Sequence, residues 1–123
     1  MRFIDSNVIA YACYANNYQE RCQEIIKAGG IINTVNIIEA FNIIQQETTR
    51  EHAKKAIRSI LKSHLKIMAV DSNMLFETVK RSLRYPQLKF IDLLHYTTAL
   101  LYNCSEIISY DRDFNNLEIE RNE

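Results

Sequence analysis

Glycine and proline are scarce in this sequence, which has 2 glycines and 1 proline among 123 residues. Disordered, collagen-like and loop-rich proteins contain far more of these residues, so those classes are excluded. Hydrophobic residues make up 47% of the chain and charged residues 24%. This composition predicts one helix-rich globular domain over residues 1–123, because a chain of that length can close a hydrophobic core.

The chain also lacks a charge excess, a disulfide pattern and an export signal. Lys plus Arg and Asp plus Glu each total 15, so a nucleic-acid partner must be bound by a local basic patch or by metal ions. The three cysteines are odd in number and form no C-x-x-C pair, which favours reduced thiols. No apolar run approaches the roughly 20 residues that cross a bilayer. We therefore expect a cytoplasmic protein with no membrane partner.

Signatures of several enzyme classes are missing as well. The three histidines form no H-E-x-x-H zinc motif or catalytic triad signature, and the chain has no Gly-rich phosphate loop. Nucleoside triphosphate hydrolysis and serine-type catalysis are therefore set aside.

Short apolar runs alternate with amphipathic segments along the chain. Strands are expected at 2–4, 31–33, 65–70, 106–109 and 117–120, and helices at 8–12, 18–28, 35–48, 50–63, 72–84 and 90–103. Gly29 and Gly30 close the second helix, Thr34 is the expected N-cap of the third, and Pro86 marks a loop. This alternation favours an α/β fold with helices on both faces of a mostly parallel sheet.

Acidic residues stand at or near the ends of these elements. Asp5 and Asp111 follow apolar strands, so both belong at the carboxyl edge of a parallel sheet, where ligand sites form. Glu39 lies on a partly apolar helix stripe, where a charge needs a partner. Asp92 stands in the first turn of its helix, where a carboxylate is favoured in any case. Each acid alone has an ordinary explanation, such as a helix cap or an Asx turn, and only their joint placement favours a site.

Four carboxylates at one sheet edge would repel one another and raise the pKa of at least one of them. A divalent cation removes this conflict. A site built from carboxylates, with no His or Cys in motif spacing, favours Mg²⁺ or Mn²⁺. The chemistry indicated is metal-assisted hydrolysis of a phosphate ester.

Four segments resemble the acidic motifs of the PIN-domain ribonucleases. They are 2–9 (RFIDSNVI), 34–39 (TVNIIE), 90–94 (FIDLL) with 99–100 (AL), and 108–114 (ISYDRDF). The segments follow the order of the family and cover nearly the whole chain. The resemblance implies a PIN-like three-layer α/β/α sandwich with four to five strands. It also implies an Mg²⁺- or Mn²⁺-dependent endoribonuclease, most similar in size to the VapC-type toxins of toxin–antitoxin pairs.

The resemblance further implies roles for individual residues. The implied metal ligands are Asp5, Glu39, Asp92 and Asp111. Asp113 is a further catalytic candidate, because the two acids of the last motif cannot be ranked from sequence. Ser109 is expected to support Asp5 or a water molecule of the site. The third motif departs mildly from the usual pattern at 93–96, where small residues are frequent. The implied partners are RNA, a cognate antitoxin and a second copy of the chain in a homodimer.

Basic residues near the third and fourth motifs are the candidate RNA contacts, although an ordinary charged surface would contain the same residue types. These residues are Lys80, Arg81, Arg84, Lys89 and Arg112.

Alternative functions stay open at this point. A PIN nuclease can serve housekeeping RNA processing instead of acting as a toxin. Carboxylates around Mg²⁺ also occur in receiver-like phosphoacceptor modules, although Glu39 on a helix and the lack of a clear Lys after a late apolar strand count against that class. A PIN-like module that binds without catalysis is disfavoured because all the acidic positions are retained.

Overall fold

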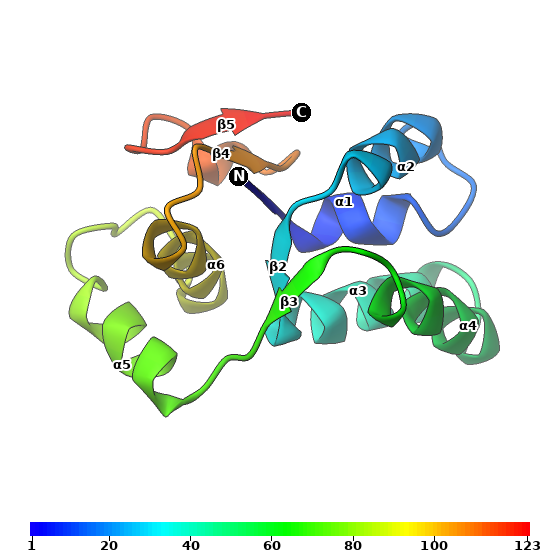
Figure 1. Cartoon of the computed structure of the whole chain (residues 1–123), viewed down its shortest axis with the longest axis horizontal. Helices are drawn as coiled ribbons and strands as arrows, with labels where there is room; N and C mark the ends of the chain where they lie inside the picture. Colours follow the sequence, from blue (N-terminus) through cyan, green and yellow to red (C-terminus); the bar gives the residue numbers. More distant parts are fainter.

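Five strands and six α-helices alternate along residues 1–123, all of which are described by the computed structural model (Figure 1). The strands are β1 Arg2–Ile4, β2 Ile31–Asn33, β3 Lys66–Met68, β4 Glu106–Ile108 and β5 Glu120–Asn122. The helices are α1 Ser6–Tyr11, α2 Gln19–Ala28, α3 Thr34–Glu47, α4 Arg50–Leu61, α5 Ser72–Lys80 and α6 Phe90–Leu101, and a short 3-10 helix, η1, covers Arg112–Phe114. The predicted α/β class is confirmed.

The five strands form one parallel sheet in the order β3-β2-β1-β4-β5. The chain moves outward from β1 through β2 to β3 and then returns to the other side of β1 as β4. Strand order therefore reverses between β1 and β4, and ligands of such sheets bind beyond the carboxyl ends of the strands at this point. Ile4 pairs with Ile108 in register, so Asp5 and Ser109 leave the sheet side by side.

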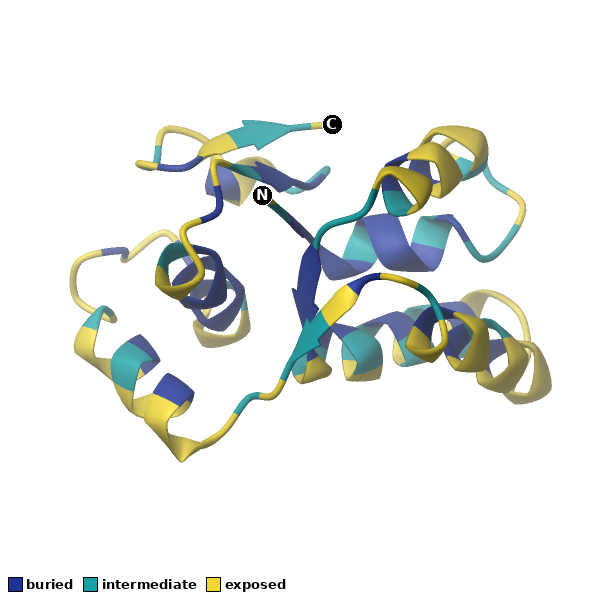
Figure 2. Cartoon of the chain, viewed as in Figure 1, coloured by how far each residue is buried: buried dark blue, intermediate teal, exposed yellow.

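Helices cover both faces of the sheet, as predicted (Figure 1). Helices α1 to α4 lie on one face, and α6 lies on the other with α5 packed against it. Successive side chains of a strand point to opposite faces, so each central strand contributes to two cores. Ile4 and Ile108 pack in the first core, whereas Phe3 and Ile107 pack in the second. Figure 2 shows buried residues along the central strands and exposed residues on the outer faces of α2, α4 and α5.

The predicted N-cap of α3 is wrong. Asn33, not Thr34, is the cap: its side-chain oxygen accepts from the backbone N–H of Asn36 at 2.9 Å. The Asn36 side chain in turn accepts from the backbone N–H of Asn33 at 2.7 Å. Asparagine is at least as good a cap as threonine, and this reciprocal capping box satisfies two free N–H groups at once. The hydroxyl of Thr34 instead accepts from the backbone N–H of Val70.

Two further boundaries differ from the prediction. Helix α5 ends at Lys80 instead of reaching residue 84, because the guanidinium of Arg81 donates to the carbonyl of Glu77 at 2.8 Å and the following residues form turns. Strand β5 lies at Glu120–Asn122 instead of 117–120. The side chain of Ile119 is buried in the second core, and its N–H donates to the Tyr96 hydroxyl.

Gly30 allows β2 to lie close against β1. A Cβ atom at this position would lie 2.9 Å from both the Arg2 carbonyl oxygen and the Ile4 Cδ1 atom. Gly29, with φ of 93°, ends α2 in the left-handed region that favours glycine. The glycine pair therefore acts as the predicted helix stop.

The cysteines are unpaired, as expected. No helix of the structure has both the length and the apolar character that crossing a bilayer requires.

Candidate active site

Asp5 lies at the junction of β1 and α1 and is almost completely buried. One carboxylate oxygen caps α1 by accepting from the backbone N–H of Ser6 at 2.7 Å. The other oxygen accepts from the hydroxyl of Ser109 at 2.6 Å, and the Ser109 hydroxyl also accepts from the backbone N–H of Asp111 at 2.9 Å. Burial raises the pKa of Asp5, and the hydrogen bonds from Ser109 and Ser6 oppose it only in part. Ser109 thus joins the end of β4 to Asp5.

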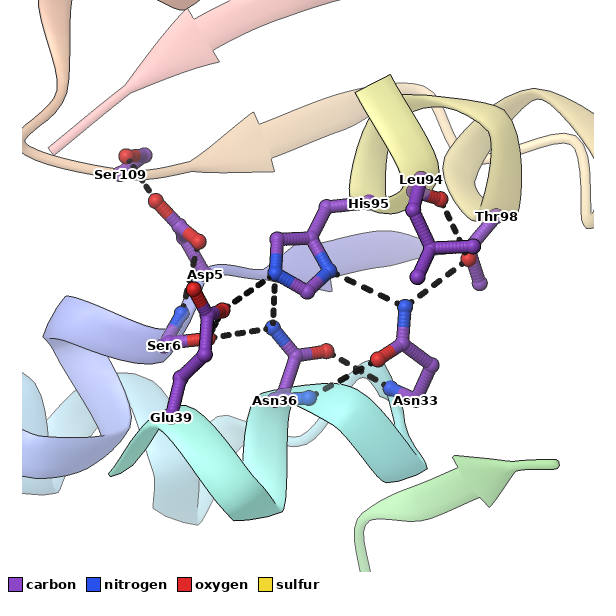
Figure 3. Close-up of polar contacts among 9 residues, drawn as sticks. All are labelled: Asp5, Ser6, Asn33, Asn36, Glu39, Leu94, His95, Thr98 and Ser109. Atoms are coloured by element: carbon purple, nitrogen blue, oxygen red, sulfur yellow. Dashed lines mark hydrogen bonds and ion pairs between the residues drawn. The ribbon is translucent and has the colours of Figure 1, made fainter. Parts of the chain in front are cut away.

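Glu39 lies on α3 and points toward the junction of β1 and α1 (Figure 3). Its Oε1 atom accepts from the Ser6 hydroxyl at 2.7 Å and from His95 Nε2 at 2.5 Å. Partial burial raises the pKa of Glu39, but the hydrogen bonds from these two donors outweigh it and hold the pKa below its ordinary value. The partner that this charge requires is therefore a pair of donors from α1 and α6.

Asp92 stands in the first turn of α6 and is half-buried. Burial raises its pKa to about 6, and the negative charges of Asp5 and Asp111 add to the effect. A carboxyl group with a pKa so far above its ordinary value is typical of functional sites. Unlike Asp5 and Glu39, Asp92 accepts no hydrogen bond that would offset these effects.

Asp111 is the N-cap residue of η1, which follows β4, and Asp113 lies within η1. Carboxylate oxygens of Asp92, Asp111 and Asp113 all lie within 4.8 Å of one another, close enough to hold one cation. One oxygen of Asp111 caps η1 by accepting from the backbone N–H of Asp113 at 2.9 Å. The ambiguity between the last two acids persists in the structure, because both approach Asp92.

A buried polar network connects Glu39 to the start of α3 (Figure 3). The amide nitrogen of Asn33 lies 3.1 Å from His95 Nδ1 and donates to the Thr98 hydroxyl at 3.0 Å. The amide nitrogen of Asn36 donates to the Ser6 hydroxyl at 2.8 Å. Asn33, Asn36, His95 and Thr98 are all fully buried. The interior beside the site is thus polar and closely hydrogen-bonded.

Sequence reasoning did not single out His95 or the two asparagines. A signal exists: Asn33, Asn36 and Glu39 are spaced three residues apart, and His95 follows Asp92 by one helical turn. Residues at such spacing share a helix face. Polar residues recurring on a face that is otherwise apolar indicate a hydrogen-bonded interior.

The basic candidates have different surroundings. Lys80 and Arg81 form ion pairs with Glu77, and Arg84 forms one with Glu118. Lys89 is the N-cap residue of α6, three residues before Asp92, and Arg112 lies between the two acids of the last motif. Both Lys89 and Arg112 are exposed and form no ion pair.

The donor set fits a hard divalent cation. Only carboxylate oxygens converge at this edge, and burial together with the negative charges of Asp5 and Asp111 raises the pKa of Asp92. The acids lie at an open sheet edge, away from the cavity of about 560 Å³ that residues of α2 and α4 line. Asp92 and Asp111 are partly exposed and Asp113 is exposed, so a long polymer can reach these acids.

Comparison with known proteins identifies the family. The PIN domain profile matches residues 2–120. A similar structure is VapC20 of Mycobacterium tuberculosis, described as a sarcin-ricin loop cleaving toxin, with a TM-score of 0.83 and 10% identity over 97% of this chain and 96% of that one. A toxin–antitoxin complex from Klebsiella pneumoniae gives a TM-score of 0.72 and 16% identity, covering 96% of this chain and 93% of that one. VapBC2 from Rickettsia felis, solved bound to a promoter DNA fragment, gives a TM-score of 0.73 and 15% identity, covering 98% of this chain and 96% of that one. No curated protein sequence matches the chain.

Proposed function

This chain belongs to the PIN-domain family, and on that premise we propose that it is a divalent-metal-dependent endoribonuclease, the toxin of a toxin–antitoxin pair. The observation that carries the proposal is the cluster of Asp92, Asp111 and Asp113 beyond the end of β4, with Asp5 and Glu39 close enough for their charges to raise the pKa of Asp92. Their all-oxygen chemistry supports Mg²⁺ or Mn²⁺ as the cofactor.

Asp5, Glu39 and Asp92 are the proposed metal ligands, with Asp111 as the fourth acid and Asp113 as the alternative. When bound, the cation supplies positive charge for the phosphate group and the leaving oxygen. Ser109 and Ser6 keep the Asp5 carboxylate in place by donating to its two oxygens. Two hydrogen bonds to each of Asp5 and Glu39 hold both carboxylates oriented before any substrate arrives.

The proposed substrate is RNA, and Lys89 and Arg112 are the best placed of the basic candidates to contact its phosphates. They flank the acids and have no competing carboxylate partner, unlike Lys80, Arg81 and Arg84. Phosphate contacts of this kind position the nucleic acid without selecting a sequence.

The toxin role and its partners are supported by similarity in fold. Two of the structural neighbours are toxin–antitoxin complexes and a third is a toxin, and each matches nearly the full length of this chain. We propose an antitoxin partner on this basis, and a homodimer from the resemblance to the VapC-type toxins. PIN-family membership favours nuclease chemistry over a receiver-like phosphoacceptor.

The test of the proposed activity is RNA cleavage by the purified chain. We expect fragments from a panel of tRNA, mRNA and ribosomal RNA when Mg²⁺ or Mn²⁺ is present, and none after EDTA. Asp5→Asn should be inactive, whereas Asp71→Asn, which makes the same charge change at the cap of α5, should cleave normally. Cleavage that persists in EDTA would contradict the proposal.

The toxin role requires a separate experiment in living cells. Induced expression of the chain in a bacterial host should stop growth, and Asp5→Asn should not. Co-expression of the protein encoded beside the gene should restore growth. Normal growth with active, soluble enzyme would favour a housekeeping role in RNA processing.

A further inference from the structure

His95 is a fully buried polar side chain in the most apolar helix of the chain. Burying an imidazole without hydrogen bonds is unfavourable, and a leucine would pack in such a helix without that cost. Both ring nitrogens have partners from other elements, Asn33 at the end of β2 and Glu39 on α3. The ring therefore connects two specific groups, in contrast to the apolar residues around it.

The orientation of the Asn33 amide is fixed by the capping box. Its oxygen accepts from the backbone N–H of Asn36, which can only donate, so the nitrogen must be on the other side of the amide. That nitrogen lies 3.1 Å from His95 Nδ1 and also donates to the Thr98 hydroxyl. Thr98 is in turn committed, because its hydroxyl donates to the Leu94 carbonyl at 2.9 Å.

This orientation determines the histidine tautomer. Nδ1 faces an N–H donor, so it must accept, and the ring proton must then be on Nε2. Nε2 points at Glu39 Oε1 at 2.5 Å and donates to it. The opposite tautomer would place two donors face to face at Nδ1 and a lone pair against the carboxylate at Nε2. The amide nitrogen of Asn36 donates one N–H to the Ser6 hydroxyl at 2.8 Å and lies 3.5 Å from Nε2, a full ångström farther than Glu39 Oε1, so the short contact to the carboxylate decides the position of the ring proton.

The consequence concerns the Glu39 carboxylate. Both of its protein donors, His95 Nε2 and the Ser6 hydroxyl, bind the same oxygen, Oε1. Oε2 accepts no hydrogen bond from the protein and is the oxygen left for a cation. The two donors come from α6 and α1, so together they fix the rotation of the carboxylate relative to Asp5 (Figure 3).

We propose that His95 is a positioning residue, which orients Glu39 for a divalent cation through an Nε2–H donor whose tautomer is set by the Asn33–Asn36 capping box. This role rests on the proposed function, since it assumes that Glu39 binds the metal. Groups that hold a metal ligand in place typically change metal affinity or activity by about 10- to 100-fold when they are removed.

Two substitutions separate the two nitrogens of the ring. His95→Gln keeps a donor at the place of Nε2 and loses the contact with Asn33. His95→Asn keeps a partner for Asn33 at the place of Nδ1 and loses the donor to Glu39. Ile25→Val is the control, because it removes one buried methyl group of α2 in the first core and touches none of these residues.

Mn²⁺ binding by the full chain, measured from the electron paramagnetic resonance signal of free Mn²⁺, is the first readout. We expect His95→Asn to bind Mn²⁺ about 10-fold more weakly than the unaltered chain, and His95→Gln to stay within about threefold of it. Melting temperatures should fall for both variants and for Ile25→Val, whose Mn²⁺ affinity should not change. Equal Mn²⁺ affinities for His95→Asn and His95→Gln would overturn the proposal while leaving the metal site intact.

A second measurement needs no variant and no metal. Long-range ¹H–¹⁵N correlation spectra of the unaltered protein should show His95 with the proton on Nε2 and a bare Nδ1. A proton on Nδ1 would overturn the proposal even if His95→Asn failed to fold. Failure of the unaltered protein to bind Mn²⁺ at all would instead contradict the proposed function, and the role of His95 in metal binding with it.

Discussion

Asp5 and Glu39 each accept two hydrogen bonds from protein donors, whereas Asp92, Asp111 and Asp113 face one another with only one such bond, the cap of η1. Asp5 is buried and has a raised pKa, whereas Glu39, which is half-buried like Asp92, has a lowered pKa. In the second group the pKa of Asp92 rises to about 6. Burial alone therefore does not decide which acid keeps its charge. Two donors outweigh partial burial at Glu39 but not the near-complete burial of Asp5, and Asp92 has a raised pKa with no donor at all, so a cation would stabilise the charges of Asp5 and Asp92.

The largest expected effect comes from removing a charge from either group. Asp5→Asn and Asp92→Asn should each lower the rate of RNA cleavage by about 100-fold or more. Each substitution removes a ligand of the cation and a negative charge that balances the charge of the cation. Initial rates in Mn²⁺ measure the effect, with circular dichroism as a check on folding. If only one of the two variants lost activity, the two groups of acids would not form one site.

The buried network that leads to Glu39 should contribute measurably to the free energy of unfolding. Asn33→Ala should lower the free energy of unfolding by about 2–3 kcal/mol, because α3 loses its cap and His95 Nδ1 is left buried without a donor. Urea unfolding monitored by circular dichroism measures the change. Thr34→Ala, at the position that the sequence indicated as the cap, should cost only about 0.5 kcal/mol. A larger loss for Thr34→Ala than for Asn33→Ala would contradict the capping box.

The raised pKa of Asp92 should make the stability of the metal-free protein depend on pH. The folded chain binds the Asp92 proton more tightly than the unfolded chain does, because the pKa is about 6 against an ordinary 3.8. Stability from this group is therefore present below about pH 4 and is lost as the pH rises to about 6. Without metal, Asp92→Asn and the unaltered chain should have the same free energy of unfolding at pH 4. At pH 7 the value for Asp92→Asn should be higher by about 2 kcal/mol, after allowance for solvent screening.

Urea unfolding of both metal-free proteins across this pH range measures the Asp92 effect. Asp5 and Glu39 are present in both proteins, so their own titrations largely cancel in the difference. Mg²⁺ should restore stability to the unaltered chain at pH 7 and do less for Asp92→Asn. Parallel pH curves for the two proteins would show that folding does not raise the pKa of Asp92.

The smallest effects are expected around the site. Lys89→Ala and Arg112→Ala should each weaken RNA binding by about two- to fivefold at low salt, and less at high salt, as expected for phosphate contacts. Lys80→Ala should change little, because Lys80 is paired with Glu77. Fluorescence anisotropy with labelled RNA in EDTA measures binding without cleavage. An equal loss in all three variants would indicate general charge attraction.

Much of the fold could be predicted because its signals are local. Central strands with both faces buried read as short apolar runs, as at Phe3 and Ile4, and the glycine pair at 29–30 marks a helix end. The positions of Asp5 and Asp111 just after apolar strands could likewise be recognised from neighbouring residues alone. Helix and strand ends were less predictable where a side chain competes for the backbone, as Arg81 does at the end of α5.

The buried network was not predictable because its partners are distant in sequence. Asn33 and His95 are 62 residues apart, and Glu39 and His95 are 56 apart. A histidine on an apolar helix has many possible partners, and only the packing of α6 against β2 and α3 selects these. Asp111 and Asp113 could not be ranked from the sequence for a similar reason. Both come close to Asp92 only in the folded chain.

A crystal structure of the protein with Mn²⁺, located by its anomalous signal, tests the central claim most directly. We predict one or more ions at the carboxyl edge of β1 and β4, with oxygens of Asp5, Glu39 and Asp92 within about 2.0–2.3 Å of metal. Either Asp111 or Asp113 should complete the set, which would rank the two acids. An ion bound elsewhere, or no ion at this edge when Mn²⁺ is in large excess, would contradict the account.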